Sequence, residues 1–271
     1  MIKLLVALGV EAKPLIAYFK LKKIDTPLPF KVYRNDTLEL VTSGSGRISM
    51  AAATAWLGGF SPHPRSIWLN IGTAGHGQLE VGTACIAHKV QEAASKRVWY
   101  PPQLIKLHTS LLSTELITVD QVHTDYENVA YDMEASAFIA TAHRFANTEF
   151  VQSVKIISDT PKSSVSLLTP AALSSYIESH LIAIDQTLHA LVDLQHKVYH
   201  DVSSINLTPF LNHWRFTASQ NHQLYETLRR WIAVRSDDPL EMLCQPSIKR
   251  ADQVLQLLNN VLKCEAPKVG P

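Results

Sequence analysis

The chain has 271 residues, of which 46% are hydrophobic and 18% are charged, and its formal net charge is +1. This composition is typical of a folded globular protein and excludes a disordered chain. The nearly balanced charge gives no indication of a nucleic-acid or anionic membrane partner. The length is enough for one large α/β domain with an appendage.

Three widely spaced cysteines, Cys85, Cys244 and Cys264, form no CxxC pair, so a reduced, cytoplasmic compartment is the simplest prediction. The N-terminal stretch MIKLLVALG has a lysine before an apolar run, but Glu11 and Lys13 follow directly. The run is about six residues long, which is shorter than the core of a signal peptide. We therefore expect a first β-strand there, and no stretch approaches the roughly 18 apolar residues of a membrane span.

Short apolar runs alternate along the chain with helical patterns. The predicted strands are residues 2–9, 38–44, 66–72, 83–90, 115–119 and 154–158, and the predicted helices of this part are residues 11–20, 47–59 and 133–146. Several strand segments are apolar without alternation, as expected for strands that are covered on both faces. The alternation of strands and helices predicts an α/β domain with a mostly parallel or mixed sheet.

The composition changes towards the C-terminus. Thr169-Pro170 predicts an N-cap followed by proline at the first helical position, and one long helix is expected from there to about residue 198. Residues 199–271 contain no predicted strand, and they carry helical patterns at 221–234 and 248–262 before a frayed tail. We expect residues 1–198 to form the chemical domain. The α-helical extension 199–271 is then a packing unit, a docking surface for a partner or a lid.

Two glycine-rich segments follow predicted strands, and ligands of open α/β sheets bind at the carboxyl ends of strands. SGSGR (43–47) offers backbone N–H groups at a helix start, where an anion or a hydroxyl can bind, and Arg47 adds a charge. A tight strand-to-helix turn explains the same pattern, which lacks the endings of a P-loop or a GxGxxG fingerprint. NIGTAGHG (70–77) allows close backbone approach to a ligand, and its His76 is either incidental or a hydrogen-bonding group.

Two acidic segments are the other candidates. In YDMEASA (131–137), Asp132 and Glu134 lie at a predicted helix start, where they could cap the helix or accept the two hydroxyls of a sugar diol. In VKIISDTP (154–161), Asp159 ends a buried strand. It is either a turn residue or a general acid. A general acid at this position would need a raised pKa, which desolvation at the end of the strand can supply.

Taken in order, these segments resemble the nucleoside phosphorylase superfamily, and within it the methylthioadenosine/S-adenosylhomocysteine nucleosidases. The resemblance covers roughly residues 1–198 and consists of an EAK turn after the first strand, SGSGR, NIGTAGHG followed by LEVGT, DMEASA and ISD. It implies a three-layer α/β/α sandwich around a mixed, partly barrel-like sheet. It also implies a homodimer that acts in nucleoside metabolism without a metal or redox cofactor.

The resemblance also implies roles for individual residues. Asp159 would protonate N7 of the purine leaving group, and Ser158 would orient Asp159. Glu134 would bind the ribose 2′ and 3′ hydroxyls, with Met133 packed against the sugar. Such a pair suits N-glycosidic cleavage, because a protonated purine leaves more easily and a carboxylate stabilises positive charge on the sugar ring. Further substrate contacts are implied for two turns, namely Ser45, Gly46, Arg47, Thr73, Ala74 and Gly75.

The nucleophile is predicted from one position. Many phosphorylases of the superfamily carry an arginine just before the Gly-Ser/Thr loop, whereas this chain has Asn70, as the nucleosidases do. Water is therefore expected, although Arg47 could still bind an anion. The predicted function is a purine nucleosidase acting on a ribonucleoside such as methylthioadenosine or S-adenosylhomocysteine. The alternatives are a phosphate-dependent purine nucleoside phosphorylase and a weakly active nucleoside-binding protein whose helical extension docks a partner.

Two departures from the family pattern stand out. In the nucleosidases the last acid of a run after the first strand positions the attacking water, and the ungapped equivalent here is Lys13. Either Glu11 takes the catalytic role through a local shift, or the water is activated differently, or activity is reduced. The segment between Lys89 and Glu115 is also short, and its Trp99 and Tyr100 either stack on a base or pack at a dimer interface. We expect packing.

Overall fold

The structure, a computed structural model, describes residues 1–24, 29–63, 65–106, 111–163, 168–203, 205–235, 237–244 and 248–265. The chain divides into two compact units, residues 1–194 and residues 195–271. The assignment of a catalytic role to the first unit stays a prediction at this point.

The first unit is built on one mixed sheet in the order β10-β6-β8-β9-β5-β1-β4-β3-β2, with β7 paired to β6. A further parallel pairing of β10 with β5 closes part of this sheet into a barrel-like ring. The strands are β1 (Ile2–Val6), β2 (Lys22–Lys23), β3 (Lys31–Arg34), β4 (Leu38–Thr42), β5 (Ile67–His76), β6 (Ala84–Glu92), β7 (Val98–Trp99), β8 (Leu111–Thr118), β9 (Ala130–Asp132) and β10 (Val151–Asp159).

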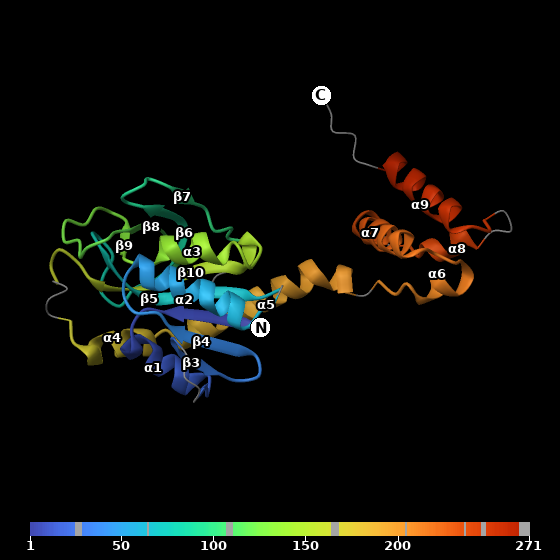
Figure 1. Cartoon of the computed structure of the whole chain (residues 1–271). Helices are drawn as coiled ribbons and strands as arrows, with labels where there is room; N and C mark the ends of the chain where they lie inside the picture. The colour runs from blue at the N-terminus through green and yellow to red at the C-terminus, as the bar shows by residue number, and fades with distance from the viewer. Residues whose placement is uncertain are drawn as a thin grey trace, which may run out of the picture. The chain divides into compact units, whose positions relative to one another are not determined.

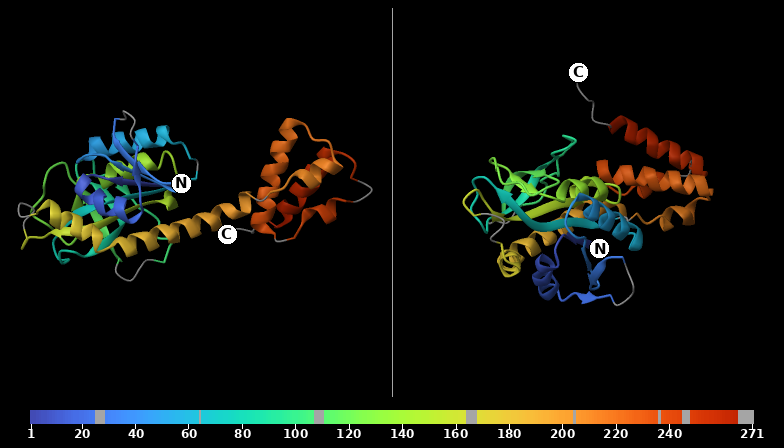
Figure 2. Two further views of the ribbon diagram at one scale, coloured as in Figure 1. Left: turned by 90° about the horizontal axis from the view of Figure 1, so that it is seen from below. Right: turned by 60° about the vertical axis from the view of Figure 1, so that its left-hand side comes forward.

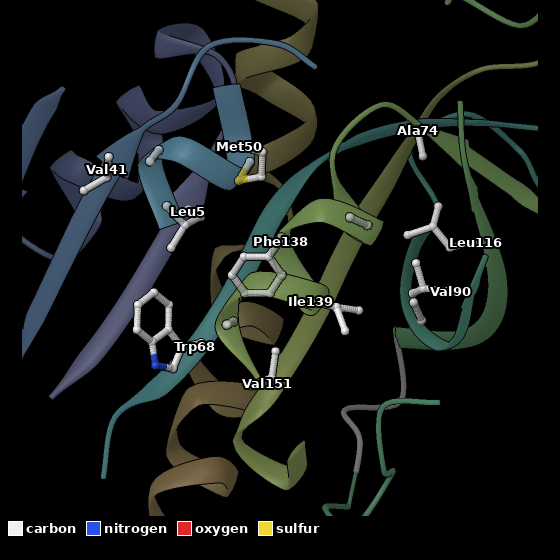
Figure 3. Packing of buried hydrophobic residues seen from close by; sticks show 14 of the residues in the cluster. Leu5, Val41, Met50, Trp68, Ala74, Val90, Leu116, Phe138, Ile139 and Val151 are labelled. Carbon is white, nitrogen blue, oxygen red and sulfur yellow. The ribbon is translucent and has the colours of Figure 1, made fainter. Parts of the chain in front are cut away.

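Helices cover both faces of the sheet (Figure 1). The helices α2 (Arg47–Phe60) and α3 (Ala135–Ala142) lie on one face, and α1 (Gly9–Tyr18), α4 (Pro170–Glu178) and the first part of α5 (Leu181–Ser203) lie on the other. Because side chains alternate along a strand, Leu5 of β1 packs under α2 and α3 while Leu4 packs under α1. Figure 3 shows the first of these two cores, with Trp68 and Phe138 at its centre. The predicted α/β/α sandwich around a mixed sheet is confirmed.

The second unit has a hydrophobic core of its own. Its helices are α6 (Thr208–His213), α7 (Ala218–Val234), α8 (Pro239–Leu243) and α9 (Ala251–Glu265), which gather into a small bundle (Figure 2). Trp214 and Trp231 are buried in it, and their indole N–H groups donate to the carbonyls of Ile248 and Asp237, at 3.0 Å each. In the portions of the chain that the structure covers, no helix combines the length and the apolar character needed to cross a membrane.

Several elements differ from the sequence-based expectations. The predicted loop NIGTAGHG belongs to strand β5 as far as His76, because β10 pairs with it at Gly72 and Gly75 and β9 pairs with it at Gly75 and His76. The predicted helix 133–146 starts only at Ala135, since Asp132 belongs to β9. The single helix expected from Pro170 to about 198 is two helices, α4 and α5. Between them the Ser179 hydroxyl donates to the Tyr176 carbonyl at 2.9 Å.

The cap expected at the start of α4 is confirmed, because the Thr169 side chain accepts a hydrogen bond from Ala172 N at 3.2 Å. The short strands β2, β3, β7 and β9 were not predicted, since they are too short for a periodic pattern. Of the frayed tail expected at residues 265–271, Glu265 is the last residue of α9, and the rest lies outside the described residues.

Candidate active site

A cavity of about 300 Å³ lies where the carboxyl ends of β5, β9 and β10 meet the first turn of α1 and the turn that precedes α2. This volume is at the lower end of the range for small-molecule sites. The strand register explains why these three strand ends meet, because Asp159 of β10 and Tyr131 of β9 both lie opposite Gly75 of β5. All of the predicted site residues except Gly46 and Arg47 line the cavity, namely Glu11, Ser45, Thr73, Ala74, Gly75, Met133, Glu134, Ser158 and Asp159.

The Asp159 carboxyl group is only 4% exposed and is held by two hydroxyl groups. The Ser158 hydroxyl donates to Asp159 Oδ1 at 2.6 Å, and the Tyr126 hydroxyl donates to Asp159 Oδ2. Burial and the bond to Asp159 both raise the pKa of Tyr126 above its ordinary value, so the phenol remains a donor. Asp159 is therefore fixed at the cavity wall with both oxygens hydrogen-bonded.

Glu11 enters the cavity from the first turn of α1. Its Oε1 accepts hydrogen bonds from Thr73 N at 2.9 Å and Thr73 Oγ1 at 2.8 Å, and its Oε2 accepts one from Leu8 N at 3.1 Å. Glu11 is 2% exposed, whereas Lys13 is exposed to solvent. Of the two residues that the sequence left in competition, Glu11 is the one that lines the cavity, and the three bonds fix its carboxylate there.

Glu134 lies opposite the start of α2. Its Oε1 accepts hydrogen bonds from Gly46 N at 2.7 Å and from the Ser45 hydroxyl at 3.2 Å. Gly46 has a φ of 93°, a conformation that favours glycine, so the SGSGR turn can present its backbone N–H to the carboxylate. Burial raises the pKa of Glu134 above its ordinary value, and the Lys155 ammonium opposes this shift. Arg47 follows the turn but does not line the cavity.

A buried ion pair lies beneath the cavity, and the sequence analysis missed it. Lys155 Nζ is 2.8 Å from Asp132 Oδ2, and both side chains are almost fully buried. Burial alone would lower the pKa of Lys155, but the carboxylates of Asp132, Glu134 and Glu11 outweigh it and raise that pKa. A buried lysine needs a charged partner. The single lysine within the apolar strand VKIIS was therefore the signal in the sequence for a buried ion pair.

Asp132 has a structural role as well. Its Oδ2 accepts a hydrogen bond from Ala135 N at 2.8 Å, and its Oδ1 accepts one from the Thr118 hydroxyl at 2.7 Å. Of the two acids in YDMEASA, Asp132 therefore caps the helix α3. Gly72 keeps the space above this network open, because a Cβ atom there would lie 3.4 Å from Lys155 Nζ and 3.5 Å from Glu11 Oε1.

Aromatic rings from the segment between β8 and β9 form one wall of the cavity. The His123 ring stacks on Tyr131 with centroids 4.5 Å apart, and the Tyr126 and Tyr131 centroids are 5.4 Å apart. These residues were not predicted. Their signal was the concentration of rings in QVHTDYENVAY, a segment without strand or helix periodicity that directly precedes the DMEASA motif.

Arg47, a predicted substrate contact, is paired elsewhere. Its Nε donates to Asp120 Oδ1 at 2.7 Å, and its guanidinium also forms an ion pair with Glu92. The Asn70 side chain, on which the prediction of the nucleophile rested, is buried within the sheet. It donates to the Leu5 carbonyl at 3.1 Å and accepts from the Ser153 hydroxyl at 3.1 Å, so it ties three strands together.

Three further candidates lie away from the cavity lining. His76 is buried, and its Nδ1 accepts hydrogen bonds from Gln78 N and Leu79 N at 3.0 Å each, so it closes a turn. Trp99 packs against the core under α3, with the Arg97 guanidinium 5.4 Å from its ring. Tyr100 is 68% exposed.

The cavity is acidic. Among its lining residues in the described part of the chain, Glu11, Asp132, Glu134 and Asp159 are carboxylic acids, and none is lysine or arginine. Lys155 lies behind the wall and is paired with Asp132. Within the described residues, no cluster of three or more His, Cys, Asp or Glu side chains has the arrangement of a metal site.

Comparison with known proteins gives a likeness of fold. Neither a protein-family model nor a curated protein matches the sequence. Among solved structures, the chain is similar to the 5′-methylthioadenosine/S-adenosylhomocysteine nucleosidase from S. pneumoniae with a transition-state inhibitor. The identity is 17% and the TM-score 0.53, with 68% of this chain and 99% of that chain covered.

Two further nucleosidases are similar to the same extent. The protein from Helicobacter pylori with 5′-methylthioadenosine in its active site is 16% identical with a TM-score of 0.53, covering 71% of this chain and 97% of that chain. The protein from Colwellia psychrerythraea in complex with adenine is 16% identical with a TM-score of 0.51, covering 71% and 94%. The fold of this chain is therefore similar to that of these nucleosidases.

Proposed function

We propose that the protein hydrolyses the N-glycosidic bond of a purine ribonucleoside, such as methylthioadenosine or S-adenosylhomocysteine. The observation that carries this proposal is the convergence of Asp159, Glu134 and Glu11 on one cavity, whose described lining residues include no lysine or arginine. The shared fold supports it, since the similar structures hold 5′-methylthioadenosine, adenine or a transition-state inhibitor.

Each carboxyl group has a separate task in this reaction. Water forms the new bond to C1′ while the bond from C1′ to N9 breaks. The electron pair of the broken bond leaves with the purine. The Asp159 proton goes to N7, and one proton of the water goes to Glu11. Glu134 accepts hydrogen bonds from the ribose hydroxyls and stabilises the positive charge that develops on the sugar ring.

The geometry around Asp159 suits an adenine base. Adenine presents N7 as an acceptor beside its N6 amino donor. A protonated carboxyl group carries one O–H donor and one acceptor oxygen, so it matches both positions. Ser158, which donates to Oδ1 at 2.6 Å, orients the group.

The charge of the cavity favours water over phosphate as the nucleophile. A phosphate dianion would meet the carboxylates of Glu11, Glu134 and Asp132 without a lysine or arginine among the described lining residues. The sequence offered Arg47 as a cation that could bind phosphate, but its guanidinium forms ion pairs with Asp120 and Glu92. The homodimeric state and the cytoplasmic location that the resemblance and the cysteines predict remain part of this proposal.

The test is to incubate the full chain with adenosine, methylthioadenosine, S-adenosylhomocysteine and inosine, with and without phosphate, and to follow the free base by chromatography. We expect release without phosphate from at least one adenine nucleoside. Strict dependence on phosphate would instead indicate a phosphorylase. Binding without release in both buffers would indicate a nucleoside-binding protein.

A further inference from the structure

Tyr126 occupies a part of the cavity that a purine base also needs. Its hydroxyl donates to Asp159 Oδ2, and its ring lies directly over the backbone of Gly75. A Cβ atom on Gly75 would lie only 2.3 Å from Tyr126 Cζ, so the ring fills the space that the missing side chain leaves. The ring and the bond together place Tyr126 in the cavity wall, directly beside the proposed general acid.

This arrangement conflicts with proton donation to a purine. With Ser158 donating to Oδ1 and Tyr126 donating to Oδ2, both oxygens of Asp159 act as acceptors. A general acid must instead present an O–H to N7 of the base, at hydrogen-bond distance. The purine and the Tyr126 hydroxyl therefore compete for the same oxygen.

Tyr126 is able to leave this position without disturbing the sheet. It lies between β8 and β9 in a segment without helix or strand, and most residues of this segment are exposed. The backbone next to it is fixed, because Gly77 N donates to the Glu127 carbonyl at 3.0 Å. Displacement of the Tyr126 hydroxyl from Asp159 Oδ2 therefore calls for a movement of the side chain and not of the strand pairing.

We propose that the Tyr126 hydroxyl takes the place of the purine base in the unliganded protein, and that the base binds by displacing it from Asp159. This inference rests on the proposed nucleosidase function. It makes Tyr126 a determinant of specificity, because a base that makes two hydrogen bonds to the Asp159 carboxyl group more than replaces the one bond that is lost, whereas a base with a single bond only restores it.

The test compares Tyr126→Phe with the wild type and with Tyr33→Phe. The second variant is the matched control, because it removes a hydroxyl from a partly buried tyrosine of β3 that does not line the cavity. The dissociation constant of adenine is measured by calorimetry, and KM and kcat are measured with the nucleoside that the wild type cleaves. A hydrogen bond to a charged group is worth enough to shift affinity by on the order of tenfold.

We expect Tyr126→Phe to bind adenine about tenfold more tightly and to show a lower KM, whereas Tyr33→Phe matches the wild type. Unchanged or weaker adenine binding by Tyr126→Phe, with base release intact in the wild type, would overturn the displacement and leave the nucleosidase function standing. If the wild type neither binds adenine nor releases a base, both proposals fail together.

Discussion

At the scale of single residues, the account depends on how three carboxyl groups are held. Glu11, Glu134 and Asp159 come from distant parts of the chain, and each is fixed by donors from another segment or by a neighbouring hydroxyl. These three can be proposed from the sequence because they lie within recognisable motifs. Tyr126 and the pairing of Lys155 with Asp132 cannot, because those contacts join residues that only folding brings together.

Asp159→Asn removes the proton that the leaving purine needs while it keeps the shape of the side chain. General acid catalysis contributes roughly 10²–10⁴-fold, so we expect a fall in kcat of this size with little change in thermal stability. Free base release and the melting temperature are measured on the same preparations. Full activity of the variant would show that another group protonates the base.

Glu134→Gln separates function from stability. Burial raises the pKa of Glu134 in the folded state above its ordinary value of 4.5. Ionisation of this group therefore costs stability at neutral pH, while below pH 4.5 the group is protonated in both the folded and the unfolded chain. We expect the variant to be at least as stable as the wild type at pH 7, and this advantage to vanish as the pH falls below 4.5.

The same variant is expected to lose on the order of a hundredfold in kcat/KM, because hydrogen bonds from the ribose to a charged acceptor are weakened. Urea unfolding at several pH values and steady-state kinetics provide the two measurements. Glu80→Gln is the control, since Glu80 is exposed and lies outside the cavity lining. A variant of Glu134 that lost stability at pH 7 would show that its carboxylate charge stabilises the fold.

At the scale of elements, the sequence predicted the segments that bury long apolar runs. It failed where tertiary pairing overrides local preference, as in NIGTAGHG, which is a strand as far as His76 because β10 and β9 pair with this part of β5. Residue propensity is a weak guide where a strand is fully covered. The consequence for the site is that Thr73 and Gly75 are held by a central strand rather than by a flexible loop.

The packing of α2 against the segment after α3 holds the SGSGR turn near Glu134. Gly58 of α2 lies against the Phe145 ring, where a Cβ atom would lie 2.5 Å from Cε1, whereas the neighbouring Gly59 has nothing within 4 Å. We expect Gly58→Ala to lower the free energy of unfolding by about 1–3 kcal/mol. Gly59→Ala, with the better helix propensity of alanine, should be neutral or slightly stabilising.

Urea unfolding of both alanine variants against the wild type provides this comparison. Equal stability of the two variants would mean that Phe145 moves aside freely and that α2 is not constrained at Gly58.

At the scale of the whole molecule, the chain combines two units with separate cores. The sequence distinguished them through the loss of strand patterns after about residue 198, and the structure separates residues 1–194 from residues 195–271. The role of the second unit could not be predicted, because a helical segment without a motif carries no chemical signature.

Trp231→Ala tests whether the second unit acts in the reaction. Trp231 is 1% exposed in the core of that unit, so its truncation should destabilise the unit by about 3–5 kcal/mol. If the second unit is a packing unit, base release by the variant stays at the wild-type level at a temperature where the first unit is folded. Calorimetry and the kinetic assay provide the measurements, with Val234→Ala on the exposed side of α7 as the control. A large loss of activity would support a lid.

The most direct test of the central claim is the rate of adenine release from methylthioadenosine in phosphate-free buffer, compared with the rate at saturating phosphate. The acidic cavity and the ion pairs of Arg47 with Asp120 and Glu92 predict equal rates, with free methylthioribose rather than a sugar phosphate as the second product. Release that requires phosphate and yields a sugar 1-phosphate would contradict the account.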